Sequence, residues 1–137
     1  MKKTDKKRQI PFGLHLMLEA YDCSPDVLSN KDAVYKILDE LPGLIGMRKL
    51  TEPSVIKAEG NNKRDPGGWS GFVIIQESHI AIHTFIKRGF VTADVYSCKD
   101  FDTSLAIKYF KQFFQTEDIE YGVEQRGIKY PVENIDE

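Results

Sequence analysis

The sequence has 137 residues, of which 41% are hydrophobic and 29% charged, and its formal net charge at pH 7 is −2. A chain of this length and apolar content can bury one core but hardly two, so we expect a single domain. The nearly balanced charge argues against nucleic acid or an anionic membrane as a partner.

Residues 1–9, MKKTDKKRQ, are expected to form a disordered basic tail in front of a domain that spans residues 10–137. A nucleic-acid-binding arm is the less favoured interpretation of this tail. No apolar run is long enough to span a bilayer, and the start of the chain lacks the apolar stretch of a signal peptide. We therefore expect a cytoplasmic protein that does not bind membranes.

The first two predicted elements are a strand and a helix. Alternation in FGLHLMLEAY predicts a strand over residues 12–21, and the helical spacing of apolar residues in SNKDAVYKILDEL predicts a helix over 29–41. Ser29 or Asn30 is the expected N-cap. The Pro42-Gly43 pair is expected to end the helix.

The middle of the chain predicts mostly strands. A second strand is expected over residues 46–50, with 54–59 as a candidate extension, and the turn formers of 59–69 predict a loop. Residues 70–98 are mainly β-branched, aromatic or apolar and are interrupted by KRG at 87–89, which predicts a hairpin.

The C-terminal part predicts a helix and a final strand. Residues 102–115 carry apolar side chains on one face and polar ones on the other, with Asp102 as the expected cap. A last strand is expected over 119–125. Hairpin-linked strands with two helices predict the α+β class, a two-layer sandwich with a mainly antiparallel sheet and helices on one face.

The expected hairpin brings reactive side chains together. The glycine of KRG suits the left-handed position of a three-residue turn, which would pair Ile86 with Phe90. Counting outward then places Ser78 opposite Cys98, to within the one-residue slip that a bulge allows. His83 has the opposite parity to Ser78. Either His83 serves another purpose or the strand is broken near Ser78.

The cysteines and histidines also have simpler explanations. Cys23 and Cys98 are too far apart in sequence for a CxxC site, and each could be a buried apolar residue. We expect His79 to be structural. His79 and His83 would share a strand face without a third or fourth ligand, so we expect no metal.

The runs GWSGFVIIQESHIAIHTF and GFVTADVYSC resemble the core of the prokaryotic S-adenosylmethionine decarboxylases, which are self-processing, pyruvoyl-dependent enzymes. The resemblance is strongest over residues 68–98, and weaker matches at GLHLMLEAYDC and QRG extend it over most of the chain. It implies that residues 10–137 form one such domain, a homodimer with an amino-acid-type substrate, in polyamine and spermidine biosynthesis.

The resemblance also assigns roles to five residues. It implies that the chain is cut between Glu77 and Ser78 and that Ser78 becomes the pyruvoyl cofactor. By the same comparison, Ser70 and His83 assist processing and Cys98 donates the proton that follows decarboxylation. These residue types suit the chemistry, because a serine hydroxyl can attack its own preceding carbonyl, a histidine can remove a proton, and a ketone can take up a substrate amine as a Schiff base.

The substrate residues depart from the family's pattern. Where the family usually has a Trp-Pro-Glu-like stretch, this chain has Phe85, Ile86 and Lys87. Phe85 can still stack on adenine, but Lys87 cannot accept hydrogen bonds from ribose hydroxyls. Glu19 matches an acidic position at which the family's first strand meets substrate, although a solvated carboxylate is the alternative.

Three functional hypotheses follow. S-adenosylmethionine is the expected substrate of a self-cleaving decarboxylase. Because Lys87 stands where the family usually has glutamate, two alternatives stay open. One is an arginine or ornithine decarboxylase of the same fold, and the other is a non-catalytic regulatory paralogue. The joint presence of the five reactive residues favours an enzyme.

Overall fold

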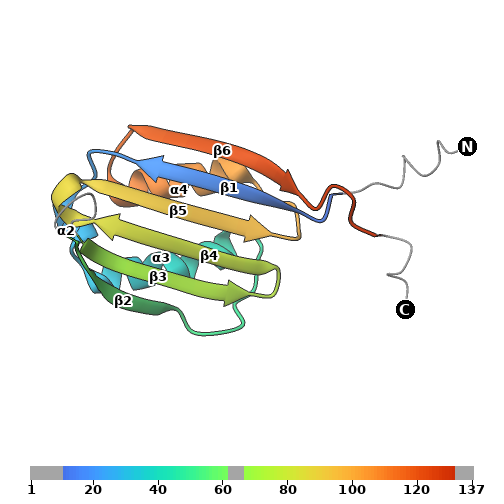
Figure 1. The fold of residues 1–137 in the computed structure, drawn as a ribbon, viewed down its shortest axis with the longest axis horizontal. Helices are drawn as coiled ribbons and strands as arrows, with labels where there is room; N and C mark the ends of the chain where they lie inside the picture. Colours follow the sequence, from blue (N-terminus) through green and yellow to red (C-terminus); the bar gives the residue numbers. More distant parts are fainter. Residues whose placement is uncertain (1–10, 62–66, 132–137) are drawn as a thin grey trace, which may run out of the picture.

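The computed structural model describes residues 11–61 and 67–131. A six-stranded antiparallel sheet, in the order β2-β3-β4-β5-β1-β6, forms one layer, and the helices lie on one of its faces (Figure 1). The elements in chain order are β1 Gly13–Ala20, α2 Pro25–Leu28, α3 Lys31–Leu44, β2 Ser54–Glu59, β3 Gly67–Ile75, β4 Ser78–Phe85, the 3-10 helix η1 Ile86–Arg88, β5 Phe90–Ser97, α4 Thr103–Phe114 and β6 Ile119–Arg126. The predicted α+β two-layer sandwich is confirmed.

The core lies between the sheet and the helices. Alternate residues of each central strand point into it, as do Phe110 and Phe114 of α4, which are fully buried. The other set of alternate side chains points away from the helices and forms what we call the open face of the sheet. It includes Met17, Glu19, Ser70, Phe72, Ile74, His79, Ala81, His83, Phe85, Thr92 and Tyr96. None of the helices in the described residues covers this face.

The two helix caps were predicted correctly, but the end of α3 was not. Asn30 Oδ1 accepts hydrogen bonds from two backbone N–H groups of the first turn, and Asp102 Oδ1 accepts one from Leu105 at 3.0 Å. Helix α3 runs through Pro42 to Leu44 instead of stopping. A proline fits the helical φ and removes one hydrogen bond only, so a buried proline in the last turn does not end the helix. The short helix α2 was not predicted.

The prediction of a strand over residues 46–50 was wrong, because this segment makes one isolated bridge, between Lys49 and Ile75. The strand in this region is β2, Ser54–Glu59, which corresponds to the candidate extension. Both stretches lie along β3, but Lys49 pairs with Ile75 and Ser54 with Phe72, so their registers differ by two residues and they do not form one continuous strand. The predicted loop over 59–69 is partly wrong, because β3 begins at Gly67. The expected basic tail over 1–9 and residues 62–66 of the loop lie outside the described residues.

Residues 70–98 contain a break between two strands. A break near Ser78 was one of the two explanations that the predicted pairing left open. A two-residue turn at Gln76 and Glu77 separates β3 from β4, so the chain has six strands instead of the expected five. At the other end, Phe85 pairs with Phe90 across a four-residue connection, where Ile86 was expected. Gly89 is left-handed there, as predicted, with φ 63°.

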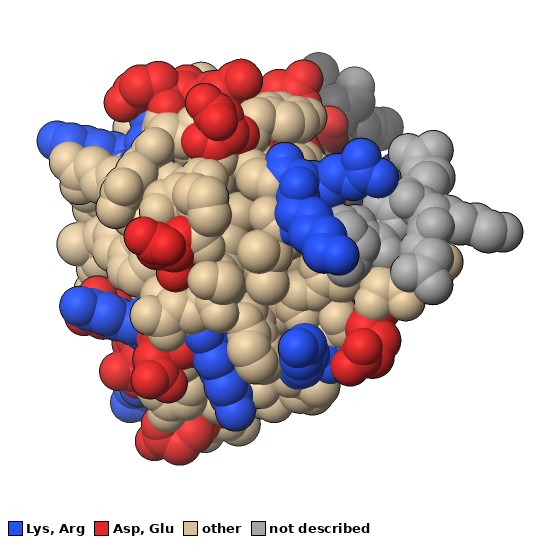
Figure 2. All heavy atoms as spheres, turned by 90° about the vertical axis from the view of Figure 1, so that its left-hand side faces the viewer, with Lys and Arg blue, Asp and Glu red and all other residues tan. Residues whose placement is uncertain are grey.

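Charged side chains of both signs are interspersed on the end of the molecule that carries η1 (Figure 2). Among the described residues, no helix combines the length and apolar character needed to cross a membrane.

Candidate active site

Ser78 is the first residue of β4 and directly follows the two-residue turn. Its φ is 153°, a backbone conformation that residues other than glycine rarely adopt. Such a conformation costs about 1–3 kcal/mol and persists only where neighbouring structure enforces it. The peptide bond between Glu77 and Ser78 therefore lies at a strained point of the chain.

The carbonyl of that peptide bond is held in place. Glu77 O accepts a hydrogen bond of 2.8 Å from the backbone N–H of Cys98. The N–H of Gln76 donates to Arg48 O at 2.8 Å, and the N–H of Arg48 donates to the Glu77 carboxylate at 3.4 Å. The turn is thus restrained from β5 on one side and from the segment after α3 on the other.

Ser97, and not Cys98, is the register partner of Ser78, so the predicted pairing is wrong by the one residue that a slip allows. Sequence reasoning missed Ser97, which is completely buried. Its Oγ donates to Lys99 O at 2.7 Å and accepts from Lys99 N at 2.9 Å. Cys98 is exposed and lines a cavity of about 290 Å³ together with Phe12, Leu14, Asp100 and Gln125.

Four polar residues form a row across the open face. The register places Ser70, His83, Thr92 and Glu19 side by side on β3, β4, β5 and β1. Ser70 Oγ lies 2.9 Å from His83 Nδ1, and Thr92 Oγ1 donates to Glu19 Oε2 at 3.2 Å. We call this set the His83 row.

The His83 row ends at Glu120 on β6, which is the register partner of Glu19. Tyr21 donates a hydrogen bond of 2.6 Å to Glu120, and this bond is the main reason that the pKa of Tyr21 is raised to about 12. This end of the row is therefore acidic, and the Tyr21 hydroxyl acts there as a hydrogen-bond donor.

Ser78 and His83 do not meet within one chain. They are five residues apart on a regular strand, which corresponds to about 16 Å at a rise of about 3.3 Å per residue. A histidine side chain cannot span that distance. The structure brings Ser70 and His83 together, and Ser78 close to Cys98, but it keeps the two pairs apart.

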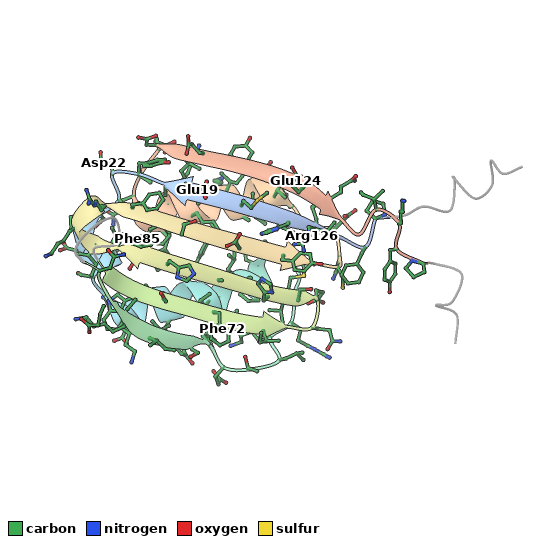
Figure 3. The ribbon with its side chains drawn as sticks, in the orientation of Figure 1. Glu19, Asp22, Phe72, Phe85, Glu124 and Arg126 are labelled. Atoms are coloured by element: carbon green, nitrogen blue, oxygen red, sulfur yellow. The ribbon has the colours of Figure 1, made fainter. Side chains whose placement is uncertain are left out.

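The predicted substrate residues lie at the His83 end. The rings of Phe85 and Phe90 are 5.5 Å apart on the open face. Lys87, in η1, lines a cavity of about 260 Å³ whose wall includes Lys57 and Glu59 of β2. Glu59 was not predicted as a site residue, because the approach of β2 to η1 leaves no local signal. Figure 3 shows Phe85 and Arg126 at opposite ends of the sheet.

Aromatic and basic side chains cluster on the open face near Ser78. His79 packs edge-on against Tyr96 with ring centroids 5.6 Å apart, in agreement with a structural role. The Arg126 guanidinium lies 4.4 Å from the Tyr96 ring centroid, and His15 Nε2 lies 2.8 Å from Asp94 Oδ1. This cluster fills the sheet surface next to the strained turn.

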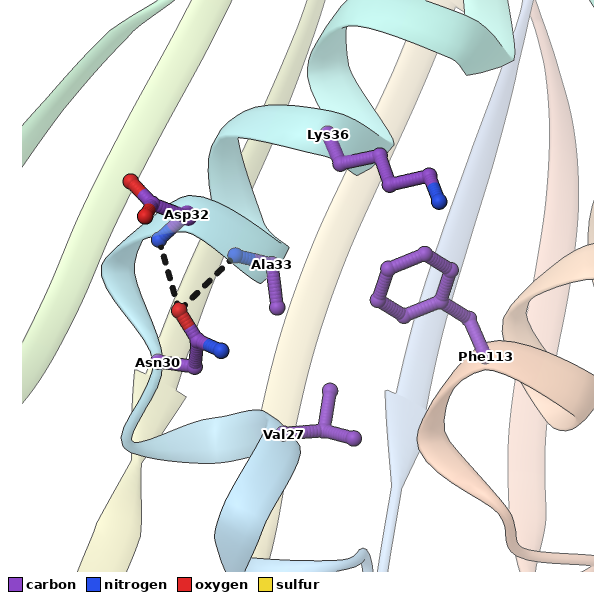
Figure 4. A pocket seen from close by; sticks show the side chains of 6 residues that line it. All are labelled: Val27, Asn30, Asp32, Ala33, Lys36 and Phe113. Atoms are coloured by element: carbon purple, nitrogen blue, oxygen red, sulfur yellow. Dashed lines mark hydrogen bonds between the residues drawn. The ribbon is translucent and has the colours of Figure 1, made fainter.

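A cavity of about 390 Å³ lies on the helix layer, away from all of these residues (Figure 4). It is lined by Val27, Asn30, Asp32, Ala33, Lys36 and Phe113. Asn30 already uses its side-chain oxygen to cap α3. None of the predicted site residues lines this cavity. Across residues 11–61 and 67–131, no group of three or more His, Cys, Asp or Glu side chains is arranged to hold a metal ion.

The two cysteines should differ sharply in reactivity. Cys23 is buried, and desolvation raises the pKa of its thiol to about 11, whereas Cys98 is exposed. At pH 8 a pKa near 11 leaves on the order of one thiolate in a thousand. We expect iodoacetamide to label Cys98 rapidly and Cys23 slowly, as measured by peptide mass spectrometry. The Cys98→Ala protein should label only at the slow rate, and fast labelling of Cys23 would contradict the described burial.

The fold is that of a two-layer α+β domain, with the candidate residues on or beside its sheet. Residues 14–127 match the family model described as S-adenosylmethionine decarboxylase. The chain belongs to this family, which confirms the resemblance drawn from the sequence.

Curated and solved relatives agree with the family assignment. The S-adenosylmethionine decarboxylase proenzyme of Thermococcus kodakarensis is 33% identical over 119 residues, which are 86% of this chain and 78% of that protein. That of Clostridium kluyveri is 35% identical over 89 residues, 65% of each chain. The crystal structure of the adenosylmethionine decarboxylase from Aquifex aeolicus is similar with a TM-score of 0.72 at 26% identity, covering 86% of this chain and 92% of that one.

Proposed function

We propose that this protein is a self-cleaving, pyruvoyl-dependent decarboxylase of polyamine biosynthesis that acts on S-adenosylmethionine. The observation that carries the proposal is the strained backbone of Ser78 beside a carbonyl held by the Cys98 N–H. The names of the relatives support the substrate and the proenzyme state. They do not favour an arginine or ornithine decarboxylase or a non-catalytic paralogue.

The first step is attack of Ser78 Oγ on the carbonyl carbon of Glu77. The C–O bond forms, the C–N bond to Ser78 breaks, and the amide becomes an ester with a free amine. Negative charge develops on Glu77 O in this step, and the Cys98 N–H at 2.8 Å is positioned to stabilise it. Strain of about 1–3 kcal/mol that is released in the transition state would accelerate the step by about fivefold to 150-fold.

The second step needs a base for the Ser78 α-proton. Its removal expels the Glu77 carboxylate and leaves dehydroalanine at position 78, which takes up water and loses ammonia to give the pyruvoyl group. His83, oriented by Ser70 at 2.9 Å, has the right chemistry but lies about 16 Å away along its own strand. We infer that His83 of the partner subunit serves Ser78.

A dimer through the open face is supported by the surface itself. Phe72 is 44% exposed and Ile74 38%, and both lie on this face. Two sheets stack at about 10 Å, which leaves room for side chains from both. In a twofold dimer the same patch meets itself, so each His83 row can lie over the end of the partner's sheet at which β4 begins; Ser78 has the parity of the buried Ile80 and Ile82, and it is its place at the start of the strand, beside the turn, that brings it within reach.

The pyruvoyl group would bind the substrate amine covalently and withdraw the electrons left by carbon dioxide. The residues present fit that group, because Ser78 can generate it where the Cys98 thiol can deliver a proton. Phe85 offers a ring for stacking on adenine, and Glu19 offers a carboxylate on the same face. Closure of the open face by a partner would exclude water from these groups.

Intact-mass measurement tests the proposal. Purified protein should separate under denaturing conditions into fragments 1–77 and 78–137, and the second fragment should resist N-terminal sequencing because it begins with a ketone. Full-length chain alone, after long incubation at neutral pH, would remove the self-cleaving function.

A further inference from the structure

We propose that Ser97 is a positioning residue that fixes Cys98 for both of its tasks, self-cleavage and proton donation. This inference rests on the proposed function. Cys98 contributes its backbone N–H to the Glu77 carbonyl in the first task and its thiol in the second. Ser97 touches neither a substrate atom nor the cleaved bond through its hydroxyl, so it acts through its neighbour.

The Ser97 hydroxyl is hydrogen-bonded to the residue that follows Cys98, so residues 97–99 form a closed turn with Cys98 in the middle. Oγ donates to the carbonyl of Lys99 at 2.7 Å and accepts from the N–H of the same residue at 2.9 Å. Both backbone groups lie beyond Cys98 in the chain, so the two hydrogen bonds restrict the dihedral angles of Cys98. The hydroxyl is completely buried, which shields these bonds from competing water.

The turn is also fixed from outside. Ser97 Oγ lies 3.6 Å from Met47 Sδ, and Lys99 Nζ donates to Gly46 O at 3.0 Å. These contacts join residues 97–99 to the segment after α3, and that segment holds the other side of the turn at Gln76. The Cys98 N–H and the Glu77 carbonyl are therefore held by the same network of contacts, and Ser97 lies in the middle of this network.

Loss of the Ser97 hydroxyl should misplace Cys98 without removing any reacting group. Electrostatic stabilisation of a developing oxyanion depends strongly on donor position, and a misplacement of about 1 Å can reduce a rate by about a hundredfold. A buried serine with only a structural role would lower stability and leave the cleavage rate of folded protein unchanged.

Thr116 provides a matched control. Its Oγ1 donates to Tyr21 O at 2.6 Å and accepts from Asp118 N at 3.1 Å, the same pattern of one carbonyl and one N–H, and it is also buried. It lies before β6 and touches none of the residues that hold Cys98. Thr116→Val removes a comparable pair of hydrogen bonds away from the site.

The experiment compares Ser97→Ala, Ser97→Thr and Thr116→Val in the full chain. For each we would measure the cleavage rate by intact mass, the melting temperature, and carbon dioxide release per cleaved chain. We expect Ser97→Ala to cleave about tenfold to a hundredfold more slowly and to release less carbon dioxide per cleaved chain. Ser97→Thr, which keeps the hydroxyl, should stay close to the parent, and Thr116→Val should melt earlier but cleave at the parent rate.

The outcomes separate this inference from the proposed function. Cleavage of Ser97→Ala at the parent rate, with normal turnover per cleaved chain, would reduce Ser97 to a structural residue while the proposed function stands. A parent chain that never cleaves would overturn the proposed function itself. If Ser97→Ala does not fold, Ser97→Cys keeps the side-chain volume but replaces the hydroxyl by a weak donor, and slow cleavage is again expected.

Discussion

A mixture of Ser78→Ala and His83→Ala chains will be cleaved, although neither variant is cleaved alone. On the proposed mechanism, Ser78→Ala lacks the nucleophile, and His83→Ala lacks the base that would serve the partner's Ser78. In a mixed dimer the His83→Ala chain keeps Ser78 and meets His83 of the Ser78→Ala chain, so one site is complete. At random pairing about half of the His83→Ala chains should be cut.

The measurement uses intact masses of two chains that carry different tags, mixed as partly unfolded protein and refolded together. Ser78→Ala removes a hydroxyl and opens almost no cavity, so folding should be preserved. His79→Ala is the control for His83→Ala, because His79 lies on the same strand and face, and this variant should still be cleaved. Rapid cleavage of His83→Ala alone would show that His83 is not the base, and failure of the mixture would remove the two-chain site.

Much of the fold was predictable because its signals are local. Asn30 and Asp102 each cap a helix with hydrogen bonds that span three residues or fewer in sequence, and the alternation in β1 follows from burial of one face. The end of α3 was not predictable in this way. Pro42 was expected to stop the helix, but a proline in the last turn fits the helical φ and removes only its own hydrogen bond.

The candidate site residues come from the sequence, but their geometry does not. The turn at Gln76 and Glu77 lacks glycine or proline, so no turn residue marks the strand break, and only the opposite parity of Ser78 and His83 raised it as one of two possibilities. The four-residue connection after Phe85 shifted the register by one and replaced Cys98 by Ser97 as the partner of Ser78. Side-chain parity concerns faces and not distance along a strand, so the parity argument alone did not bring out the separation of Ser78 and His83.

Lys87→Glu should lower the KM for S-adenosylmethionine by at least about tenfold. Lys87 is exposed, so its repulsion of a substrate sulfonium, if the two lay about 6 Å apart, would be screened to about 0.7–3 kcal/mol for an effective dielectric between 80 and 20. The new carboxylate could also accept hydrogen bonds from ribose hydroxyls, worth about 1.5–3 kcal/mol. Either contribution alone at its upper value accounts for a hundredfold change.

Two comparisons make this result specific. Lys57→Glu makes the same charge change in the wall of the same cavity, but from β2, and should give a smaller gain if the position of the acceptor matters. Carbon dioxide release from arginine and ornithine should gain less than release from S-adenosylmethionine, because neither amino acid has ribose hydroxyls. Strong activity of the parent on S-adenosylmethionine, unchanged by Lys87→Glu, would place Lys87 outside the pocket. In that case Glu59, which lines the same cavity, becomes the candidate acceptor, and Glu59→Gln should then raise the KM.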